Sequence, residues 1–436
     1  MKPINVGLLG IGTVGGGTFT VLKRNAEEIT RRAGRPIVIT TVADKNLELA
    51  RKVTGGAVKL TDDAFAVVAD PEIDIVVELI GGYGVAKELV LKAIENGKHV
   101  VTANKALLAV HGNEIFAAAQ SRGVMVAFEA AVAGGIPIIK ALREGLTANR
   151  IEWLAGIING TTNFILSEMR DKGLPFAEVL KEAQALGYAE ADPTFDIEGI
   201  DAAHKLSLLS ALGFGVPINF DAAHIEGISK LAPEDIRYAE QLGYRIKLLG
   251  ITKRTPKGIE LRVHPTLVPM QRLIANVEGA MNAVLVKGDA VGFTLYYGKG
   301  AGAEPTASAV VADLVDVTRM HTADPENHVP HLAFQADRMA EVPWLSIEDT
   351  VTSYYFRMRV ADQPGVLADI TRILADGGIS IDALFQREPS EGENQTDIIM
   401  LTHDAVERDV NAAVRRIEQL PTVLAPVIRI RQEELG

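Results

Sequence analysis

The sequence predicts an α/β protein built from several domains, and three observations support this. An apolar stretch near the N-terminus leads into a glycine-rich turn and then into a helix. Strands and helices alternate from there to about residue 135, a pattern typical of a parallel sheet covered by helices. A second strand–helix pattern begins near residue 351. Because 436 residues exceed what one core can bury, two or three domains are expected.

The N-terminal motif predicts a dinucleotide site. Residues 4–9 form an apolar strand, the next six are Gly10-Ile11-Gly12-Thr13-Val14-Gly15, and a helix is expected over 14–32. This is G-x-G-x-x-G between a strand and a helix, the context in which the pattern is specific. The first glycine allows the turn, the second lets the backbone approach a pyrophosphate, and the third permits close helix–strand packing. A Rossmann-type domain that binds NAD(H) or NADP(H) is therefore predicted.

Later strands are expected at 37–43, 74–80, 99–103 and 124–129. An acid after the second strand usually binds the ribose hydroxyls of NAD, and Asp44 is in that position. Lys45 follows it and suits the 2′-phosphate of NADP. Asp44 favours NAD and Lys45 favours NADP, so the preference stays open.

Composition indicates a cytoplasmic enzyme. The net charge of −12 disfavours nucleic acid and anionic membranes as partners, and no run of about 18 apolar residues could span a bilayer. Cysteine is absent, which excludes disulfides, thiolate metal sites and a thiohemiacetal route of aldehyde oxidation. Direct hydride transfer between an alcohol and a carbonyl group remains possible.

The segment 187–205 concentrates charged groups before a helix that starts at about residue 200. Asp201 and Lys205 are four residues apart and so share one face of that helix. A lysine beside a carboxylate, where an apolar helix enters a core, suits proton transfer or amine recognition. An exposed ion pair is the alternative, and this segment alone does not exclude it.

Together with residues 102–108, Thr-Ala-Asn-Lys-Ala-Leu-Leu, these motifs make the chain resemble homoserine dehydrogenase over essentially its whole length. The family signature is matched, with its spacing, at Ala183, Gly187, Asp192, Pro193, Asp196, Gly199, Asp201 and Lys205. The resemblance implies reversible, NAD(P)H-dependent reduction of aspartate-4-semialdehyde to homoserine, in threonine, methionine and isoleucine biosynthesis.

The resemblance also implies roles for single residues. Lys205 matches the general acid/base, and Lys105 lies by the nicotinamide and substrate, where it is the rival proton donor. Glu190 and Asp201 match the carboxylates that bind the substrate ammonium, and Asp201 also suits holding Lys205 in place. An ammonium near the carbonyl oxygen can stabilise the alkoxide and protonate it.

Further sites follow from the same resemblance. Cofactor contacts are expected from Gly10, Gly12, Thr13, Val14, Gly15, Ala43, Lys45, Lys105, Gly187 and Gly302. Similar enzymes hold a sodium ion, largely by main-chain oxygens, at positions matching Glu129, Val132, Gly134 and Ile136. An ordinary crossover between domains explains that glycine-rich segment equally well.

Four parts of the chain are expected. Residues 1–135, completed by a helix at 303–320, form the Rossmann domain; 136–302 form an α+β catalytic and dimerisation domain; 321–350 are a linker. Residues 351–436 predict a ferredoxin-like βαββαβ domain, and the turn Asp362-Gln363-Pro364-Gly365-Val366-Leu367 resembles that of ACT domains. In this family the usual ACT effector is threonine; a plain dimerisation module is the alternative. The resemblance implies a homodimer or homotetramer.

Two other functions are weighed against this one. Another Rossmann oxidoreductase acting on an amino acid would keep the glycine loop without needing the 190–205 pattern. A non-catalytic amino-acid sensor would keep the C-terminal domain and have no use for Lys105 and Lys205.

Overall fold

The computed structural model of the chain describes residues 2–386 and 394–436. They form two compact units, each assembled from three stretches of sequence. The first comprises Met1–Gly160, Asp201–Ala223 and Ala280–Val342, and the second Thr161–Ile200, His224–Gly279 and Pro343–Gly436. Within the described ranges, every helix is too short or too polar to cross a bilayer.

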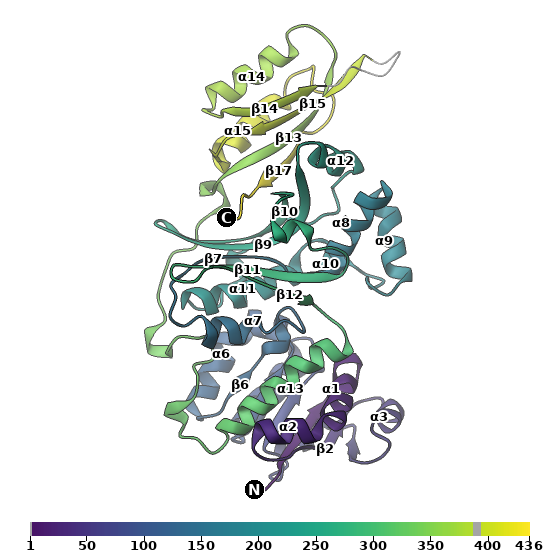
Figure 1. Ribbon diagram of the computed structural model, residues 1–436, viewed down its shortest axis with the longest axis vertical. Helices are drawn as coiled ribbons and strands as arrows, with labels where there is room; N and C mark the ends of the chain where they lie inside the picture. Colours follow the sequence, from purple (N-terminus) through teal and green to yellow (C-terminus); the bar gives the residue numbers. More distant parts are fainter. Residues whose placement is uncertain (1, 387–393) are drawn as a thin grey trace. The chain divides into compact units, whose positions relative to one another are not determined.

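A six-stranded parallel sheet forms the N-terminal part of the first unit (Figure 1). Its strands are β1 (Ile4–Leu9), β2 (Ile37–Ala43), β3 (Lys59–Thr61), β4 (Ile75–Glu78), β5 (His99–Thr102) and β6 (Val126–Ala127). Their order, β3-β2-β1-β4-β5-β6, is that of a doubly wound dinucleotide-binding sheet, which confirms the predicted Rossmann fold. Strand β3 was not predicted, because its three residues, Lys59–Thr61, are partly exposed and not uniformly apolar.

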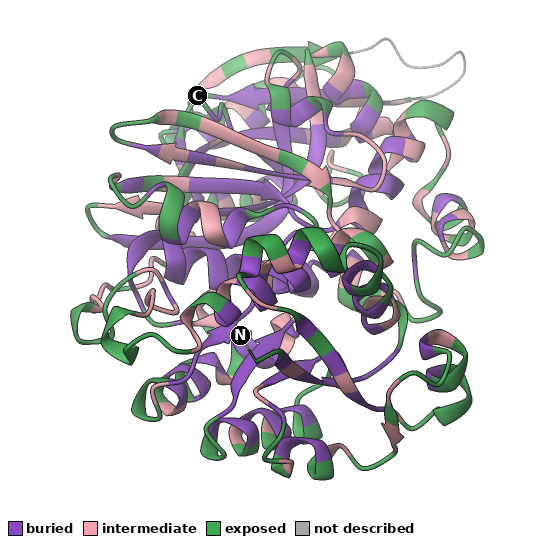
Figure 2. Cartoon of the chain, turned by 60° about the horizontal axis from the view of Figure 1, so that its bottom comes forward, coloured by how far each residue is buried: buried purple, intermediate pink, exposed green. Residues whose placement is uncertain are grey.

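Helices cover this sheet and bury one side each, while their outer sides stay exposed (Figure 2). Asn25 breaks the helix expected over 14–32. It adopts non-helical dihedral angles between α1 and α2, because asparagine competes for nearby backbone groups and favours helix ends. The helices are α1 (Thr13–Arg24), α2 (Ala26–Ala33), α3 (Leu47–Thr54), α4 (Ala64–Ala69), α5 (Gly84–Glu95) and α6 (Lys105–Ser121).

A later helix, α13 (Ala303–Met320), returns to the same sheet. Ala307, Val310 and Leu314 belong to the buried cluster that also contains residues of β1 and β4. The approach to α1 is close: a Cβ on Gly17 would lie 2.4 Å from the carbonyl oxygen of Ala303. Glycine at position 17 is therefore needed for α13 to pack there.

The rest of the first unit is an antiparallel sheet with a buried helix. β12 (Gly292–Lys299), β11 (Met281–Gly288) and β7 (Ile151–Ile157) are neighbours in that order. The helix α11 (Ile200–Phe214) carries Asp201 and Lys205 and is buried along most of its length, as its apolar pattern predicted. A short helix, α7 (Ile138–Lys140), continues into a π-type turn, Ala141–Gly145.

The second unit is built on a sheet of order β9-β10-β17-β13-β15-β14, with β8 paired to β10 and β16 to β13. Its strands are β8 (His224–Ile225), β9 (Tyr244–Thr255), β10 (Gly258–Pro269), β13 (Val351–Ala361), β14 (Ile381–Gln386), β15 (Gln395–Thr402), β16 (Ala405–Val406) and β17 (Ile428–Gln432). Its helices are α8 (Gly160–Lys172), α9 (Phe176–Ala185), α10 (Thr194–Ile197), α12 (Pro233–Gln241), α14 (Val366–Asp376) and α15 (Glu407–Ile417). Short 3₁₀ turns in the chain are Glu129–Ala131, Phe220–Ala222, Leu273–Asn276, Pro325–Asn327, Ala336–Arg338 and Ile347–Asp349.

The predicted βαββαβ order is confirmed by β13, α14, β14, β15, α15 and β17, which enclose their own buried cluster; residues 387–393 of this part lie outside the described residues. The last strand has a second role that the pattern did not predict. β17 lies between β13, to which it is antiparallel, and β10, to which it is parallel with Arg431 opposite Thr266. Cutting the chain at residue 350 would therefore strip β10 of a neighbour.

A buried histidine at the start of β5 gives the first unit a response to acid. The Nδ1 atom of His99 accepts the Met125 N–H at 2.9 Å, and the rings of His321 and His328 lie 5.3 and 6.2 Å away. Burial, and then the two neighbouring imidazoles, lower the pKa of His99 to about 4. The folded protein therefore favours the neutral form of the His99 ring.

We expect this histidine to destabilise the fold between pH 6.5 and 4. Above pH 6.5, the pKa of this histidine in the unfolded chain, the ring is neutral in both the folded and the unfolded state. Between pH 6.5 and pH 4 only the unfolded state takes up the proton, so the free energy of unfolding falls by about 3 kcal/mol by pH 4. His99→Gln should lose less stability than the parent when urea unfolding is compared at pH 7 and pH 4.5. His403→Gln, in which an exposed histidine is removed, should follow the parent. Equal losses in all three proteins would contradict the prediction.

Candidate functional site

The glycine loop after β1 leaves one helix end open for a ligand. Gly10 has φ +93°, and a Cβ there would lie 2.7 Å from the carbonyl oxygen of Leu79. A Cβ on Gly15 would lie 2.1 Å from the carbonyl oxygen of Gly10. Gly12, which caps α1, has no described atom within 4 Å of its Cβ position and gives no side-chain cap. The N–H groups of the first turn, from Thr13 and Val14 onward, suit a pyrophosphate at this end.

Of the two charged residues after β2, Asp44 supports the glycine loop and Lys45 is exposed. The Ile11 N–H donates to Asp44 Oδ2 and the Asn46 N–H to Asp44 Oδ1, both at 2.7 Å. The Gly10 N–H donates to the carbonyl oxygen of Ala43 at 2.8 Å. Lys45 is exposed and donates to the carbonyl oxygen of Asp62 at 2.9 Å. Asp44 thus ties the glycine loop to the end of β2.

The ends of β4 and β5 hold a buried network that sequence reasoning missed. The Glu78 carboxylate is fully buried and accepts the N–H groups of Ile80 and Gly81 and the hydroxyl of Thr102, at 2.8, 3.0 and 2.7 Å. Asn104 caps α6 by accepting the Leu107 N–H at 3.1 Å. The sequence signal that could have indicated this network is Glu78, a single charged residue at the end of an apolar strand. This network fixes the turn from which Lys105 starts α6.

Two lysines converge on one buried aspartate. Lys205 Nζ donates to Asp201 Oδ2 at 2.6 Å and to the carbonyl oxygen of Ile158 at 2.8 Å. Lys105 Nζ lies 3.2 Å from Asp201 Oδ1, and the Asn159 amide donates to Asp201 Oδ2 at 2.9 Å. The side chains are 4% exposed for Asp201, 11% for Lys205 and 34% for Lys105. The aspartate therefore orients both ammonium groups.

Asp201 stays ionised although it is buried. Burial by itself would raise the pKa of its carboxyl, but the charges of Lys205 and then Lys105, with hydrogen bonds from Lys205 and Asn159, hold the pKa well below its usual range. Burial lowers the pKa of neighbouring His204 to about 4, so that ring is neutral near pH 7. The cluster thus holds two ammonium groups against one carboxylate, an arrangement suited to stabilising negative charge that develops on an oxygen.

The remaining predicted contacts fall in two places. Glu190 and Gly187 lie between α9 and α10 in the second unit, whereas Lys105, Asp201 and Lys205 all lie in the first. The Gln184 amide donates to the backbone oxygen of Glu190 at 2.9 Å, and Gly187 has φ +77°. Gly302 caps α13 with φ +122°. The structure brings together the lysines and Asp201; Glu190 is not placed relative to them.

The predicted sodium residues lie in one tight turn of the first unit. Ala133 and Gly134 both have positive φ, 56° and 51°. The carboxylate of Glu129 does not face outward: it accepts the N–H groups of Ile139 and Lys140 at 2.9 and 2.8 Å. Burial and the nearby Asp313 raise its pKa to about 7. Any cation held here would thus rely on main-chain oxygens of this turn, which are suitable ligands for a hard cation.

Three family models match successive parts of the chain. Residues 10–129 match the family model "Homoserine dehydrogenase, NAD binding domain", residues 137–315 "Homoserine dehydrogenase", and residues 354–422 "ACT domain".

Relatives are similar over the whole chain. Homoserine dehydrogenase of Pseudomonas aeruginosa is 63% identical, with 100% of both chains covered. The crystal structure of a homoserine dehydrogenase from Thiobacillus denitrificans is 71% identical with a TM-score of 0.96, covering 100% of this chain and 99% of that one. A hyperthermophilic archaeal homoserine dehydrogenase in complex with NADPH is 25% identical with a TM-score of 0.62, covering 73% and 98%. With a nucleotide-binding loop and a paired-lysine cluster in the same unit, this chain belongs to the homoserine dehydrogenase family and reduces aspartate-4-semialdehyde reversibly to homoserine with NAD(P)H.

Proposed function

We propose that Lys205 transfers the proton of this reaction and that Asp201 and Lys105 position it and the substrate. The observation that carries this proposal is the convergence of both ammonium groups on the Asp201 carboxylate. Of the two lysines, Lys205 is the less exposed, and a charge withdrawn from water acts more strongly on a nearby oxygen.

The proposed reaction couples hydride transfer to the aldehyde carbon with proton transfer from Lys205 to its oxygen. The reduced nicotinamide supplies the hydride that goes to the aldehyde carbon, and the carbonyl electron pair moves to the oxygen. The Lys205 ammonium gives its proton to that oxygen and becomes a neutral amine, which regains a proton from solvent. The reverse reaction uses the neutral amine as base, and Lys105 stabilises the charge on the oxygen in both directions.

Glu190 is proposed to bind the ammonium of the substrate. Its family position and the fixed backbone of its turn, held by Gln184, support the assignment. Asp201 remains a proposed second ligand of the ammonium, although its two oxygens already contact Lys205 and Lys105.

Glu190→Gln tests the assignment. A charge-assisted hydrogen bond contributes about 1.5–3 kcal/mol, so the KM for L-homoserine should rise about 10- to 100-fold while kcat changes little. Initial rates of cofactor reduction measure both constants. Glu178→Gln, an exposed glutamate on α9, is the matched control and should behave as the parent. An unchanged KM in Glu190→Gln would remove this residue from the substrate site.

For the cofactor, we propose that Lys45 contacts the 2′-phosphate of NADP(H). Both oxygens of Asp44 already accept backbone N–H groups, and Lys45 beside it is exposed. The archaeal relative with bound NADPH is consistent with this preference.

Lys45→Glu should therefore lower kcat/KM for NADPH by about 10- to 100-fold and for NADH far less, because only NADPH carries the phosphate that the lysine would meet. Steady-state rates with both cofactors, in the parent and the variant, give the ratio. Equal losses with both cofactors would contradict the role.

We propose that main-chain oxygens of Glu129, Val132, Gly134 and Ile136 bind sodium. The turn that contains these residues, with positive φ at Ala133 and Gly134, supports the proposal.

L-Threonine is proposed as an inhibitor that acts through the ACT domain. The family match at residues 354–422 supports this proposal, and inhibition of homoserine oxidation measures it. The enzyme is proposed to act in the cytoplasm as a homodimer or homotetramer, which light scattering would distinguish.

A further inference from the structure

Glu78, the last residue of β4, is a buried carboxylate without a neutralising cation. It forms no ion pair within residues 2–386 and 394–436, and its three partners there are two backbone N–H groups and one hydroxyl. Burying a charge without a counter-charge costs free energy, which a neutral side chain of similar shape would avoid. A carboxylate at this position therefore points to a role beyond packing.

A closed ring of hydrogen bonds connects Glu78 to the residue before Lys105. The Thr102 hydroxyl donates to Glu78 Oε2 at 2.7 Å and accepts the Asn104 N–H at 3.0 Å. The Asn104 side-chain amide donates to the last carbonyl oxygen of the loop 80–82 at 2.8 Å, and the first two N–H groups of that loop donate back to Glu78. The ring therefore fixes the backbone at the point where α6 begins with Lys105.

The negative charge of Glu78 sets the direction of every hydrogen bond in this ring. An ionised carboxyl group accepts hydrogen bonds and donates none, so the Thr102 hydroxyl hydrogen must point toward Glu78. A lone pair of the Thr102 oxygen is then left for the Asn104 N–H. Glu78→Gln would turn an N–H₂ group toward one side of the ring, where either the hydroxyl must rotate or a backbone N–H loses its acceptor.

Glu78 also lies at the edge of the sheet where the cofactor is expected. β1 and β4 are neighbours at the point where the strand order reverses, so the crevice for a dinucleotide opens at their carboxyl ends. Leu79 donates its N–H to the carbonyl oxygen of Leu9 at 2.8 Å, and its own carbonyl oxygen lies against Gly10. The segment 78–82 thus contacts the glycine loop through its backbone and the start of α6 through the ring.

From these contacts we infer that Glu78 is a positioning residue for the reaction. Through Thr102 and Asn104 it determines where α6 starts. Lys105 is thereby held in register with the cofactor crevice and with Asp201, whose Oδ1 lies 3.2 Å from the lysine Nζ. The inference rests on the proposed role of Lys105 in stabilising charge on the substrate oxygen, and Glu78 acts through that lysine without contacting the substrate.

Glu78→Gln and Thr102→Val each break the ring at one point. Each should lower kcat for homoserine oxidation about 10- to 100-fold, the usual effect of a small displacement of a catalytic group, and change the KM for L-homoserine much less. Thr102→Ser keeps the hydroxyl and should turn over close to the parent. Packing alone would predict the opposite order, because valine preserves the shape of threonine. Glu88→Gln, an exposed glutamate on α5, is the matched control and should behave as the parent.

A double-mutant cycle shows whether Glu78 acts through Lys105. In the Lys105→Met background the ammonium is already gone, so adding Glu78→Gln should not lower kcat further. A role in general stability would lower kcat by the same factor in both backgrounds. Effects on kcat that multiply in the double variant would therefore overturn the inference.

Cofactor affinity provides a measurement that does not depend on turnover. The contact of Leu79 with Gly10 uses backbone atoms, so the Kd for NADPH, measured by fluorescence titration, should be that of the parent in Glu78→Gln and Thr102→Val. A Kd that rises in parallel with the loss of kcat would overturn the inference, because Glu78 would then act on the glycine loop.

The Lys105→Met variant distinguishes failure of the inference from failure of the proposal on which it rests. If Lys105→Met is slow while Glu78→Gln and Thr102→Val turn over as the parent, the positioning role is overturned and the role of Lys105 stands. If Lys105→Met itself keeps the parent turnover, both are overturned. Should Glu78→Gln fail to fold, equal turnover in Thr102→Ser and Thr102→Val would still overturn the positioning role.

Discussion

Lys205→Met is expected to lower kcat for homoserine oxidation by about 10²–10⁴-fold, the usual contribution of a positioned general acid or base. The substrate would still bind through Glu190 and Lys105, so KM should change much less. Asp201 keeps Lys105 and Asn159 as partners in this variant, which limits the structural damage. Initial-rate kinetics in both directions, with thermal unfolding to verify the fold, give the result.

Lys205→Arg separates proton transfer from charge. A guanidinium stays protonated and cannot act as the base, so this variant should remain as slow as Lys205→Met. Recovery of turnover by arginine would mean that the positive charge alone matters. Parent-like turnover in Lys205→Met, with the loss appearing in Lys105→Met instead, would assign the proton to Lys105.

Local sequence signals predicted much of the nucleotide-binding part. The strand before the glycine loop, the loop itself and the i,i+4 pair of Asp201 and Lys205 are short-range patterns, and all three are present in the structure. The partner of that pair, Lys105, is nearly a hundred residues away, and family resemblance rather than periodicity linked it to Asp201. Asn25 was overlooked because one capping residue inside a helical pattern is a weak signal.

The pairing of strands that are distant in the sequence could not be predicted from local sequence patterns. β17 has the alternation of any edge strand, and nothing in residues 428–432 indicates that β10 will lie on its other side. The interleaving of the two units, in which α11 joins the first while the segment before it joins the second, likewise depends on tertiary contacts. Arg431 would be assigned to a surface by its charge, yet it is 1% exposed because two carboxylates lie opposite it.

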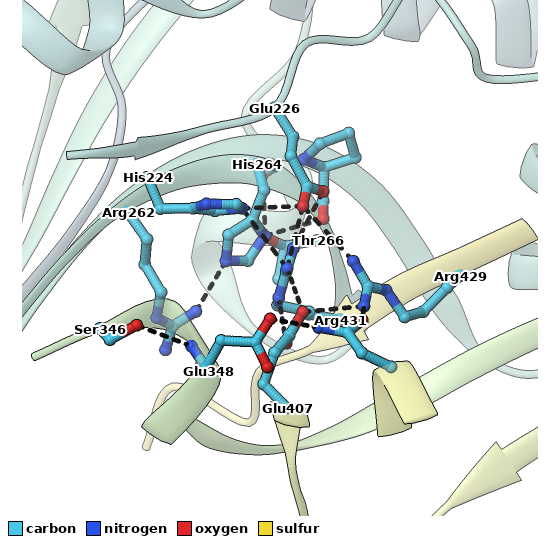
Figure 3. Close-up of polar contacts among 12 residues, drawn as sticks. His224, Glu226, Arg262, His264, Thr266, Ser346, Glu348, Glu407, Arg429 and Arg431 are labelled. Atoms are coloured by element: carbon cyan, nitrogen blue, oxygen red, sulfur yellow. Dashed lines mark hydrogen bonds and ion pairs between the residues drawn. The ribbon is translucent and has the colours of Figure 1, made fainter. Parts of the chain in front are cut away.

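Arg431→Met should cost about 3–5 kcal/mol of unfolding free energy, the typical effect of removing one partner from a buried ion pair. The guanidinium makes two hydrogen bonds to Glu407, two to Glu226 and a longer one, of 3.5 Å, to His224 (Figure 3). Without it, Glu407, which is 1% exposed, would keep Arg429 and the Tyr354 hydroxyl at 2.6 Å as partners, and Glu226 would keep His224. Urea unfolding at pH 7 measures the loss. Arg416→Met, at an exposed pair, should cost at most about 1 kcal/mol.

The pH dependence of this loss identifies its cause. Burial alone would raise the carboxyl pKa values of Glu226 and Glu407. Hydrogen bonds from His224 and Arg431 to Glu226, and from Arg431 to Glu407, hold both pKa values below the ordinary 4.5. Depressed carboxyl pKa values add stability above pH 4.5 that is lost as the pH falls through the folded values. The gap between parent and Arg431→Met should therefore narrow as the pH drops below about 4.5, and adding Glu407→Gln to the variant should recover part of the loss at pH 7. A gap that stays constant with pH would mean that lost packing, rather than uncompensated charge, destabilises the strand joining β10 to β13.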